Sequence, residues 1–245
     1  MIIDAHTHLG ISYNAWWKNE ISEDEFILTM DEWKIDKSCV SYFGINYNPE
    51  EGNDIVANFI NKYPNRLIGF ACVSPLMYKT AVNEVIRAKN DLGMKGIKLH
   101  PFANNYYSDS PIVFPVIEKA IELDLPLLFH SGSDEFSHPR NLANLAKLYP
   151  EAKIIMAHMG GNSYFEAIHV ASVNKNIILD TAESCNFYGI INYAIDFVGE
   201  DRIVFGSDFP STNMGPELSK IKDANITKIQ KEKILGLNMK RTLKL

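Results

Sequence analysis

Short apolar runs alternate with amphipathic stretches along this whole chain, and that alternation restricts the fold more than any other feature. Eight runs have the length and the β-branched content of strands: Met1–Ala5, Ser38–Phe43, Leu67–Val73, Gly96–His100, Pro126–His130, Lys153–His158, Ile177–Asp180 and Arg202–Phe205. Apolar residues recur at helical spacing in the stretches between them: Glu23–Lys34, Asp54–Tyr63, Thr80–Asp91, Val113–Leu123, Asn141–Leu148, Tyr164–Val173 and Ile190–Val198. Strands and helices in alternation predict βαβ units and a parallel sheet.

Eight such units in 245 residues favour a closed (β/α)₈ TIM barrel, an α/β fold that commonly has this length as a single domain. The alternative is an open doubly wound sheet, which predicts a glycine-rich phosphate turn after the first strand. His6-Thr7-His8 stands there instead. No linker or shift in composition divides the chain, so we expect one domain over residues 1–245. After Ser211 we expect one or two closing helices, with Ala224–Gly236 the best candidate.

Charge and cysteine content exclude several classes of partner. The net charge is −6, and no cluster of Lys and Arg with interleaved aromatic residues indicates nucleic-acid binding. No apolar run approaches the roughly 18 residues of a membrane span, and the N-terminus does not resemble a signal peptide. Cys39, Cys72 and Cys185 are far apart, which argues against disulfides or a cysteine zinc site. We expect a cytoplasmic protein that acts on a small molecule. Barrels of this kind often self-associate, so a homo-oligomer is a further expectation.

Polar residues gather where the predicted strands end, which is where barrel enzymes have their active sites. Five of the seven histidines and two carboxylates lie there: His6, His8, His100, His130, His158, Asp180 and Asp208. His6 and His8 point to one face, because side chains alternate along a strand. Burying imidazoles with a carboxylate is costly unless they bind a cation or form hydrogen bonds, and such ligands suit zinc, iron or manganese. Asp4, one step deeper on the same face, is expected to orient a ligand.

Simpler roles stay open for individual residues. Asp208 could cap a following helix, since Ser207 and Pro210 fit a helix entry. Lys98 and His100, on one face of the fourth strand, could face the substrate or form a structural ion pair or hydrogen bond.

Loop residues are candidates for the substrate pocket. Arg140, in the loop after the fifth strand, could bind a substrate carboxylate at the barrel mouth, or lie solvated in the first turn of a helix. Trp16 in the first loop, with Tyr106 and Tyr107 in the fourth, could wall an apolar substrate or pack the loops on each other.

Five short motifs resemble the amidohydrolase superfamily, and within it the amidohydrolase-2 branch. They occur in the family's order: Ile3-Asp4-Ala5-His6-Thr7-His8, Gly96-Ile97-Lys98-Leu99-His100-Pro101, Phe129-His130-Ser131-Gly132, Ala157-His158-Met159-Gly160-Gly161 and Gly206-Ser207-Asp208-Phe209-Pro210. The resemblance implies that His6, His8 and His130 hold a metal, with Asp208 as a further ligand or as the base. It also implies that His158 positions or deprotonates a metal-bound water.

The resemblance leaves the reaction open. Relatives with two metals bridge them with a carboxylated lysine, and Lys98 lies on the corresponding strand. The amidohydrolase-2 branch usually has one metal, so we expect one divalent ion, zinc before manganese or iron, with Lys98 or His100 facing the substrate. The first expectation is hydrolysis of an amide, ester or lactone by metal-activated water. The alternatives are a decarboxylase of a small aromatic or unsaturated carboxylic acid, and a non-catalytic metal-binding barrel.

Overall fold

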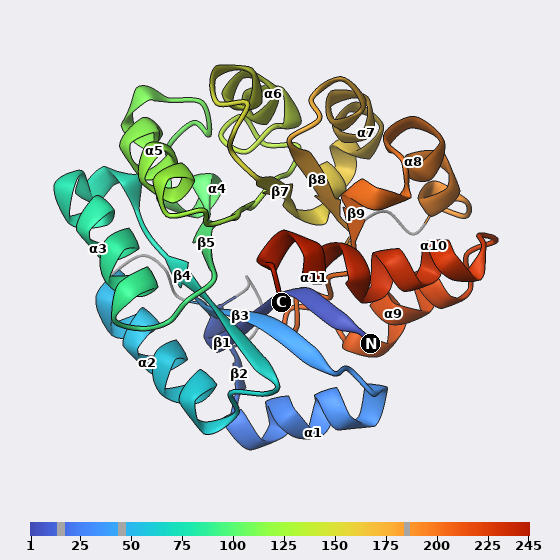
Figure 1. The fold of residues 1–245 in the computed structure, drawn as a ribbon, viewed down its shortest axis with the longest axis horizontal. Coiled ribbons are helices and arrows are strands. Elements are labelled where there is room, and N and C mark those ends of the chain that lie inside the picture. Colours follow the sequence, from blue (N-terminus) through green and yellow to red (C-terminus); the bar gives the residue numbers. More distant parts are fainter. Residues whose placement is uncertain (14–17, 44–47, 184–186) are drawn as a thin grey trace.

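The computed structural model describes residues 1–13, 18–43, 48–183 and 187–245. Eight parallel strands form a ring with the helices outside it (Figure 1). Neighbouring strands pair in chain order: β1 (Ile3–Tyr13), β3 (Lys37–Phe43), β4 (Leu67–Cys72), β5 (Gly96–Leu99), β6 (Leu127–Phe129), β7 (Ile154–Met156), β8 (Ile177–Asp180) and β9 (Ile203–Val204). The predicted (β/α)₈ TIM barrel is therefore confirmed.

The ring closes between β1 and the segment that follows β9. The backbone N–H of Asp208 donates to the His6 carbonyl at 2.7 Å, and the His8 N–H donates to the Phe209 carbonyl at 2.7 Å. The two ends of the chain that carry the predicted ligands are thus joined backbone to backbone.

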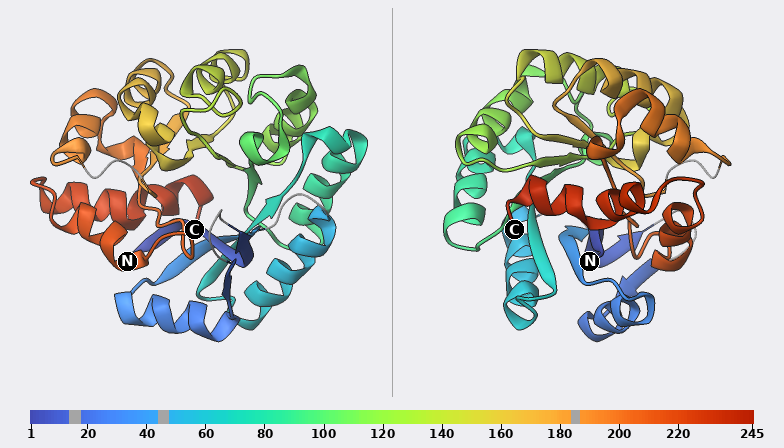
Figure 2. Two further views of the ribbon diagram at one scale, coloured as in Figure 1. Left: turned by 180° about the vertical axis from the view of Figure 1, so that it is seen from behind. Right: turned by 45° about the vertical axis from the view of Figure 1, so that its right-hand side comes forward.

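Helices cover the outside of the ring, as the views of Figure 2 show. Those between the strands are α1 (Glu23–Trp33), α2 (Pro49–Lys62), α3 (Lys79–Asn90), α4 (Pro101–Asn104), α5 (Phe114–Glu122), α6 (Pro139–Leu148), α7 (Tyr164–Val173) and α8 (Ile190–Val198). Local sequence sets their ends. In α1, Ser22 and Glu25 form a reciprocal capping box, and Lys34 ends the helix in the left-handed conformation.

Three details differ from the sequence-based expectations. The short strand β2 (Lys18–Ile21) pairs antiparallel with an extended β1, whereas no hairpin was expected. The C-terminal segment contains α9 (Met214–Lys222), α10 (Lys228–Glu232), a π-helical turn and α11 (Asn238–Leu243), more than the one or two helices expected. Helix α2 starts at Pro49 rather than at Asp54, because Asn48 caps it and proline suits the first turn.

Strand side chains alternate between two cores. Leu127 and Phe129 pack among the helices, whereas Leu128 between them belongs to a second cluster with Ile3 and Phe70 inside the ring. This period of two is what strands buried on both faces require. None of the helices in the described ranges is long and apolar enough to cross a membrane.

Candidate metal centre

Three potential ligand atoms converge where β1 meets the segment after β9. His6 Nε2 and His8 Nε2 lie 3.2 Å apart, and Asp208 Oδ1 lies 3.1 Å from the former and 3.0 Å from the latter. Two ligands at right angles and about 2.1 Å from one ion lie about 3.0 Å apart. The spacings of this His6–His8–Asp208 triad therefore suit three adjacent positions around an octahedral divalent cation.

Each histidine of the triad makes a further contact through Nδ1. These contacts leave the Nε2 lone pairs directed at the point where the three ligand atoms converge. His6 Nδ1 lies 2.8 Å from Asp180 Oδ2, and both side chains are fully buried. Burial raises the pKa of Asp180 to about 7, and its carboxylate also accepts from the backbone N–H groups of His158 and Ala182. Above that pH the ionised carboxylate accepts the Nδ1 proton of His6, which leaves Nε2 to bind a metal. Ser41 Oγ donates to the Thr7 carbonyl at 3.5 Å, so it accepts from His8 Nδ1, which lies 3.0 Å away. The sequence placed Asp180 at a strand end without a role, and Ser41 carries no spacing signal that could have found it.

Asp4 does not orient either imidazole, so that expectation is wrong. Its Oδ1 accepts from the backbone N–H of His6 at 3.1 Å and of Ser207 at 3.0 Å. It lies one step too deep to reach the rings and instead ties β1 to the segment before Asp208. Burial raises the pKa of Asp4 to about 8.

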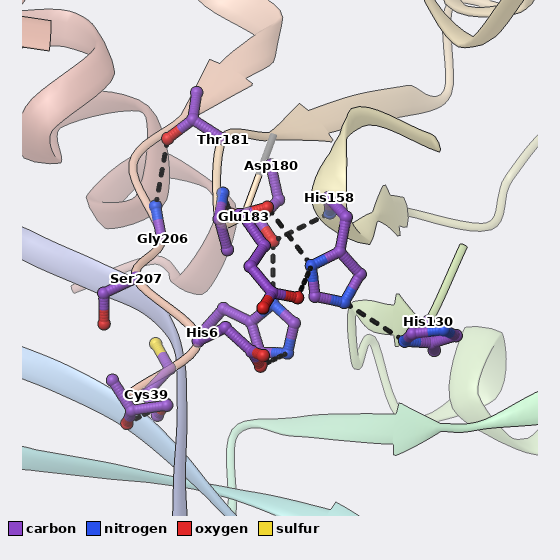
Figure 3. A network of polar contacts seen from close by, with 12 residues as sticks. His6, Cys39, His130, His158, Asp180, Thr181, Glu183, Gly206 and Ser207 are labelled. Atoms are coloured by element: carbon purple, nitrogen blue, oxygen red, sulfur yellow. Dashed lines mark hydrogen bonds and ion pairs between the residues drawn. The ribbon is translucent and has the colours of Figure 1, made fainter. Parts of the chain in front are cut away.

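Gly206 makes room for the contact between Asp180 and His6. A Cβ atom at this position would lie 2.0 Å from Asp180 Oδ1 and 2.9 Å from His6 Cβ. Its backbone conformation is one that other residues adopt, so the requirement for glycine comes from close approach alone. Figure 3 shows Gly206 beside these two side chains.

Asp208 directs its carboxylate at the two histidines of the triad and is not a helix cap. It adopts φ +59°, and the next helix, α9, begins six residues later with Asn213 as its cap. Burial acts to raise the pKa of Asp208, but the close contact with His8 Nε2 and the charges of His158, His8 and Lys98 outweigh it and lower the pKa to about 2. Asp208 is therefore an ionised carboxylate directed at two imidazole lone pairs.

Three further histidines, His158, His130 and His100, form a contiguous group next to the triad, and Figure 3 shows the first two of them. His158 follows β7 with φ +58°, and its Nδ1 lies 3.1 Å from the carbonyl of Ala182. Since a carbonyl only accepts, the proton is on Nδ1, and Nε2 faces His130 Nδ1 at 3.1 Å. The His130 ring stacks on His100 with centroids 3.9 Å apart. Burial lowers the pKa of His158 to about 4 and that of His130 and His100 well below the usual histidine value.

His158 is also close enough to share a cation with the triad. Among the described residues, His6, His158 and Asp208 each offer a ligand atom, and these atoms lie within 4.8 Å of one another. His130 contacts His158 and His100, so its role as a ligand stays a prediction. The donor set of imidazole nitrogens and one carboxylate fits a divalent transition metal.

Lys98 reaches the triad from β5 with a buried side chain. Its side chain is 1% exposed, and Nζ lies 2.7 Å from His6 Nε2. Burial lowers the pKa of this amine. His6 Nε2 has one lone pair, so a bound cation and the Lys98 N–H compete for it.

Other predicted pocket residues lie elsewhere or outside the described ranges. Arg140 lies in the first turn of α6 with its side chain 74% exposed, and Nε pairs with Glu166 Oε1 at 2.9 Å. This is the solvated arrangement that the sequence left open, and the structure does not join Arg140 to the triad. Trp16 is outside the described residues. Tyr106 is buried and Tyr107 is exposed.

A carboxylate that the sequence analysis did not assign faces the same group. Glu183 lies just after β8, and its Oε2 is 4.0 Å from His158 Nδ1. Burial, with the charges of Asp208 and Glu217, raises the pKa of Glu183 to about 7. Its place three residues beyond a strand end was the available signal.

Comparison with known proteins identifies the family. The amidohydrolase family model Amidohydro_2 matches residues 3–245. The chain belongs to this amidohydrolase family. Two curated relatives are a gamma-resorcylate decarboxylase of Polaromonas sp. (23% identical, 82% of this chain and 77% of the relative) and a 2-amino-3-carboxymuconate-6-semialdehyde decarboxylase of Dictyostelium discoideum (21% identical, 97% and 79%).

A solved structure supports the same fold. The dihydroxybenzoic acid decarboxylase of Polaromonas sp. JS666, with bound manganese and the inhibitor 2-nitroresorcinol, superposes with a TM-score of 0.81. It is 20% identical and covers 100% of this chain and 97% of its own. These relatives are enzymes, which agrees with the expectation of an enzyme, and the metal named for this structure is manganese rather than the expected zinc.

Proposed function

We propose that this chain is a metal-dependent decarboxylase that releases carbon dioxide from a small aromatic or unsaturated carboxylic acid. The observation that carries the proposal is the proximity of two groups: the His6–His8–Asp208 triad, which suits a cation, and the His158 imidazole, which lies within 4.8 Å of His6 and Asp208. The curated relatives are decarboxylases, which supports this reaction among those the family motifs allow.

The triad would hold the ion, and manganese is the metal that the similar structure supports. When bound, a divalent cation would anchor the substrate carboxylate and a neighbouring oxygen and offset their negative charge. Asp180 contributes by keeping the proton of His6 on Nδ1, away from the triad.

His158 is the residue that we assign as the general acid. The bond between the carboxyl carbon and the substrate carbon breaks, its electron pair stays on the substrate carbon, and a proton takes the place of carbon dioxide. Ala182 holds the Nδ1 proton of His158, so the proton for transfer would be a second one, carried on Nε2, the atom that faces His130. Because burial lowers the pKa of His158 to about 4, the negative charge of a bound substrate would have to stabilise this charged form. His130 would orient that atom, in addition to its predicted role as a ligand.

His100 and Lys98 are the candidates for binding the substrate carboxylate. The His100 Nδ1 accepts from the backbone N–H of Ala103 at 3.2 Å, so a neutral ring carries its proton on Nε2 and can donate it to an oxygen. Lys98 supplies a buried amine at the triad. Arg140 would have to leave Glu166 to take part.

The other two functions receive less support. For hydrolysis, Asp208 would act as the base toward water and His158 would polarise the carbonyl, and the same residues are present for this. The curated relatives favour carbon–carbon cleavage instead. A non-catalytic barrel is disfavoured because each predicted ligand position still carries a histidine or an aspartate.

The direct test is product analysis with manganese-loaded protein. We expect carbon dioxide and resorcinol from 2,6-dihydroxybenzoate or a related acid, and no release by the variant Asp208→Asn. Asp196→Asn, on the exposed face of α8, is the matched control and should retain activity. Release of an amine or alcohol from amides, esters or lactones, with no carbon dioxide from any acid of the panel, would contradict the proposal.

A further inference from the structure

Glu183 presents its carboxylate to the candidate metal centre. Figure 3 shows this side chain directed toward His6 and His158. Its Oε2 lies 4.0 Å from His158 Nδ1, but that nitrogen already has its proton on the Ala182 carbonyl. Within the described part of the chain, no side chain or backbone N–H donates to the Glu183 carboxylate. A carboxylate that is 49% exposed and lies in an active site can therefore accept a hydrogen bond from a ligand.

The backbone holds this side chain in place. Glu183 adopts φ +50°, a conformation that residues other than glycine rarely have. Its backbone N–H donates to Glu217 Oε2 at 3.1 Å, and the same oxygen lies 2.6 Å from Lys220 Nζ. Strained backbone that neighbouring contacts maintain is common at ligand sites. The carboxylate is thus set in its orientation before a ligand arrives.

The charges around Glu183 discriminate between substituents. Asp208 and Glu217 are near enough for their negative charges to act on Glu183, and Lys220, which pairs with Glu217 at 2.6 Å, offsets part of that charge. A hydroxyl or amino group satisfies the free carboxylate, whereas a second carboxylate meets like charge and finds no donor.

We propose that Glu183 is a specificity-determining residue, which accepts a hydrogen bond from a hydroxyl or amino substituent of the substrate acid and excludes a second carboxylate at that position. This inference rests on the proposed function, because it takes the substrate to be a small carboxylic acid bound at the triad. It adds to the proposed function a preference among the substituents of that acid, set by Glu183.

The test compares the binding of three acids that differ at one position. In 2,6-dihydroxybenzoate that position carries a hydroxyl, in salicylate a hydrogen and in 3-hydroxyphthalate a carboxylate. Dissociation constants are measured by calorimetry with manganese-loaded protein at pH 8.5, for the wild type, Glu183→Gln and Glu122→Gln. Glu122, on α5, pairs with Lys119 and lies outside the centre, so it controls for the loss of one negative charge.

We expect the wild type to bind 2,6-dihydroxybenzoate more tightly than salicylate, and 3-hydroxyphthalate most weakly. Glu183→Gln should change the ratio of the dissociation constants of 2,6-dihydroxybenzoate and 3-hydroxyphthalate by about tenfold in favour of 3-hydroxyphthalate, since like charges at close range are strongly unfavourable. Glu122→Gln should leave the ratio unchanged. An unchanged ratio in Glu183→Gln, or no binding of any of the acids by the wild type, overturns the inference.

Turnover is measured on the same samples, which separates the two proposals. If the ratio shifts as expected and no carbon dioxide is released, the specificity role stands and the decarboxylase proposal fails. If carbon dioxide is released and the ratio does not shift, the decarboxylase stands and the role of Glu183 fails.

Discussion

Asp180 Oδ2 lies 2.8 Å from His6 Nδ1, and both side chains are fully buried inside the barrel. This pair connects two strands that are far apart in the sequence. It determines which nitrogen of His6 carries the proton, and it thereby directs the Nε2 lone pair to the triad.

Loss of the Asp180 carboxylate should weaken metal binding. We expect Asp180→Asn to raise the dissociation constant for manganese about 10- to 100-fold, as is usual when the partner of a ligand histidine is removed. Competition with a chelator of known affinity measures it. Asp196→Asn should bind as the wild type does. Equal affinity in Asp180→Asn and the wild type would show that the contact does not serve the metal.

Gly206 should tolerate no larger residue. In Gly206→Ala the new Cβ would meet Asp180 Oδ1, and we expect the free energy of unfolding to fall by about 1–3 kcal/mol, as for other overpacked sites, together with weaker metal binding. Urea denaturation of metal-free protein measures the first effect. The control Gly93→Ala has no atom within 4 Å but a φ of +67°, so it reports backbone strain alone and should leave metal affinity intact. Normal stability and metal affinity in Gly206→Ala would refute the close contact.

His158→Asn should separate chemistry from metal binding. We expect turnover to fall about 100-fold or more, which is typical for loss of a general acid, while manganese is retained. Metal content and carbon dioxide release are measured on the same preparation. Loss of the metal in this variant would instead make His158 a ligand, as its place within 4.8 Å of the partners in the triad permits.

Asp124 provides a prediction for pH-dependent stability away from the centre. Hydrogen bonds from Lys153 and Lys244 lower the pKa of Asp124 to about 2. A lowered folded-state pKa stabilises the protein above the unfolded value near 4, and this contribution is lost as the pH falls from about 4 to 2. Because Asp124 is half exposed, we expect less than about 1 kcal/mol from these pairs. Thermal melts of Asp124→Asn should converge with those of the wild type at low pH, and a constant difference from pH 7 to 2 would contradict this origin.

The sequence predicts the fold and most of the centre because both depend on strand ends. All eight parallel strands were expected, and the rule that active sites lie at their carboxyl ends found His6, His8, His158 and Asp208. Strand periodicity predicts that such side chains point to the same side of the sheet, but it does not predict the distances between them.

The rest depends on contacts between distant segments, which one sequence does not encode in a readable pattern. Asp4 and Asp180 both suit the role of orienting a ligand, and only the contact of Asp180 Oδ2 with His6 Nδ1, across the barrel from β8 to β1, favours Asp180. Glu183 lies in a loop, where its direction depends on a strained backbone and on Glu217. The prediction that Arg140 binds substrate rested on its loop position alone. In the structure its side chain pairs with Glu166 of α7 instead.

The metal content of purified protein tests the assignment of the triad most directly. It is measured by elemental mass spectrometry after loading with manganese and removal of the excess. We expect about one equivalent per chain in the wild type and none in the double variant His6→Ala/His8→Ala, with circular dichroism showing that the variant is folded. A folded double variant that retains as much metal as the wild type would contradict the assignment of the triad, and with it the proposed reaction at this centre.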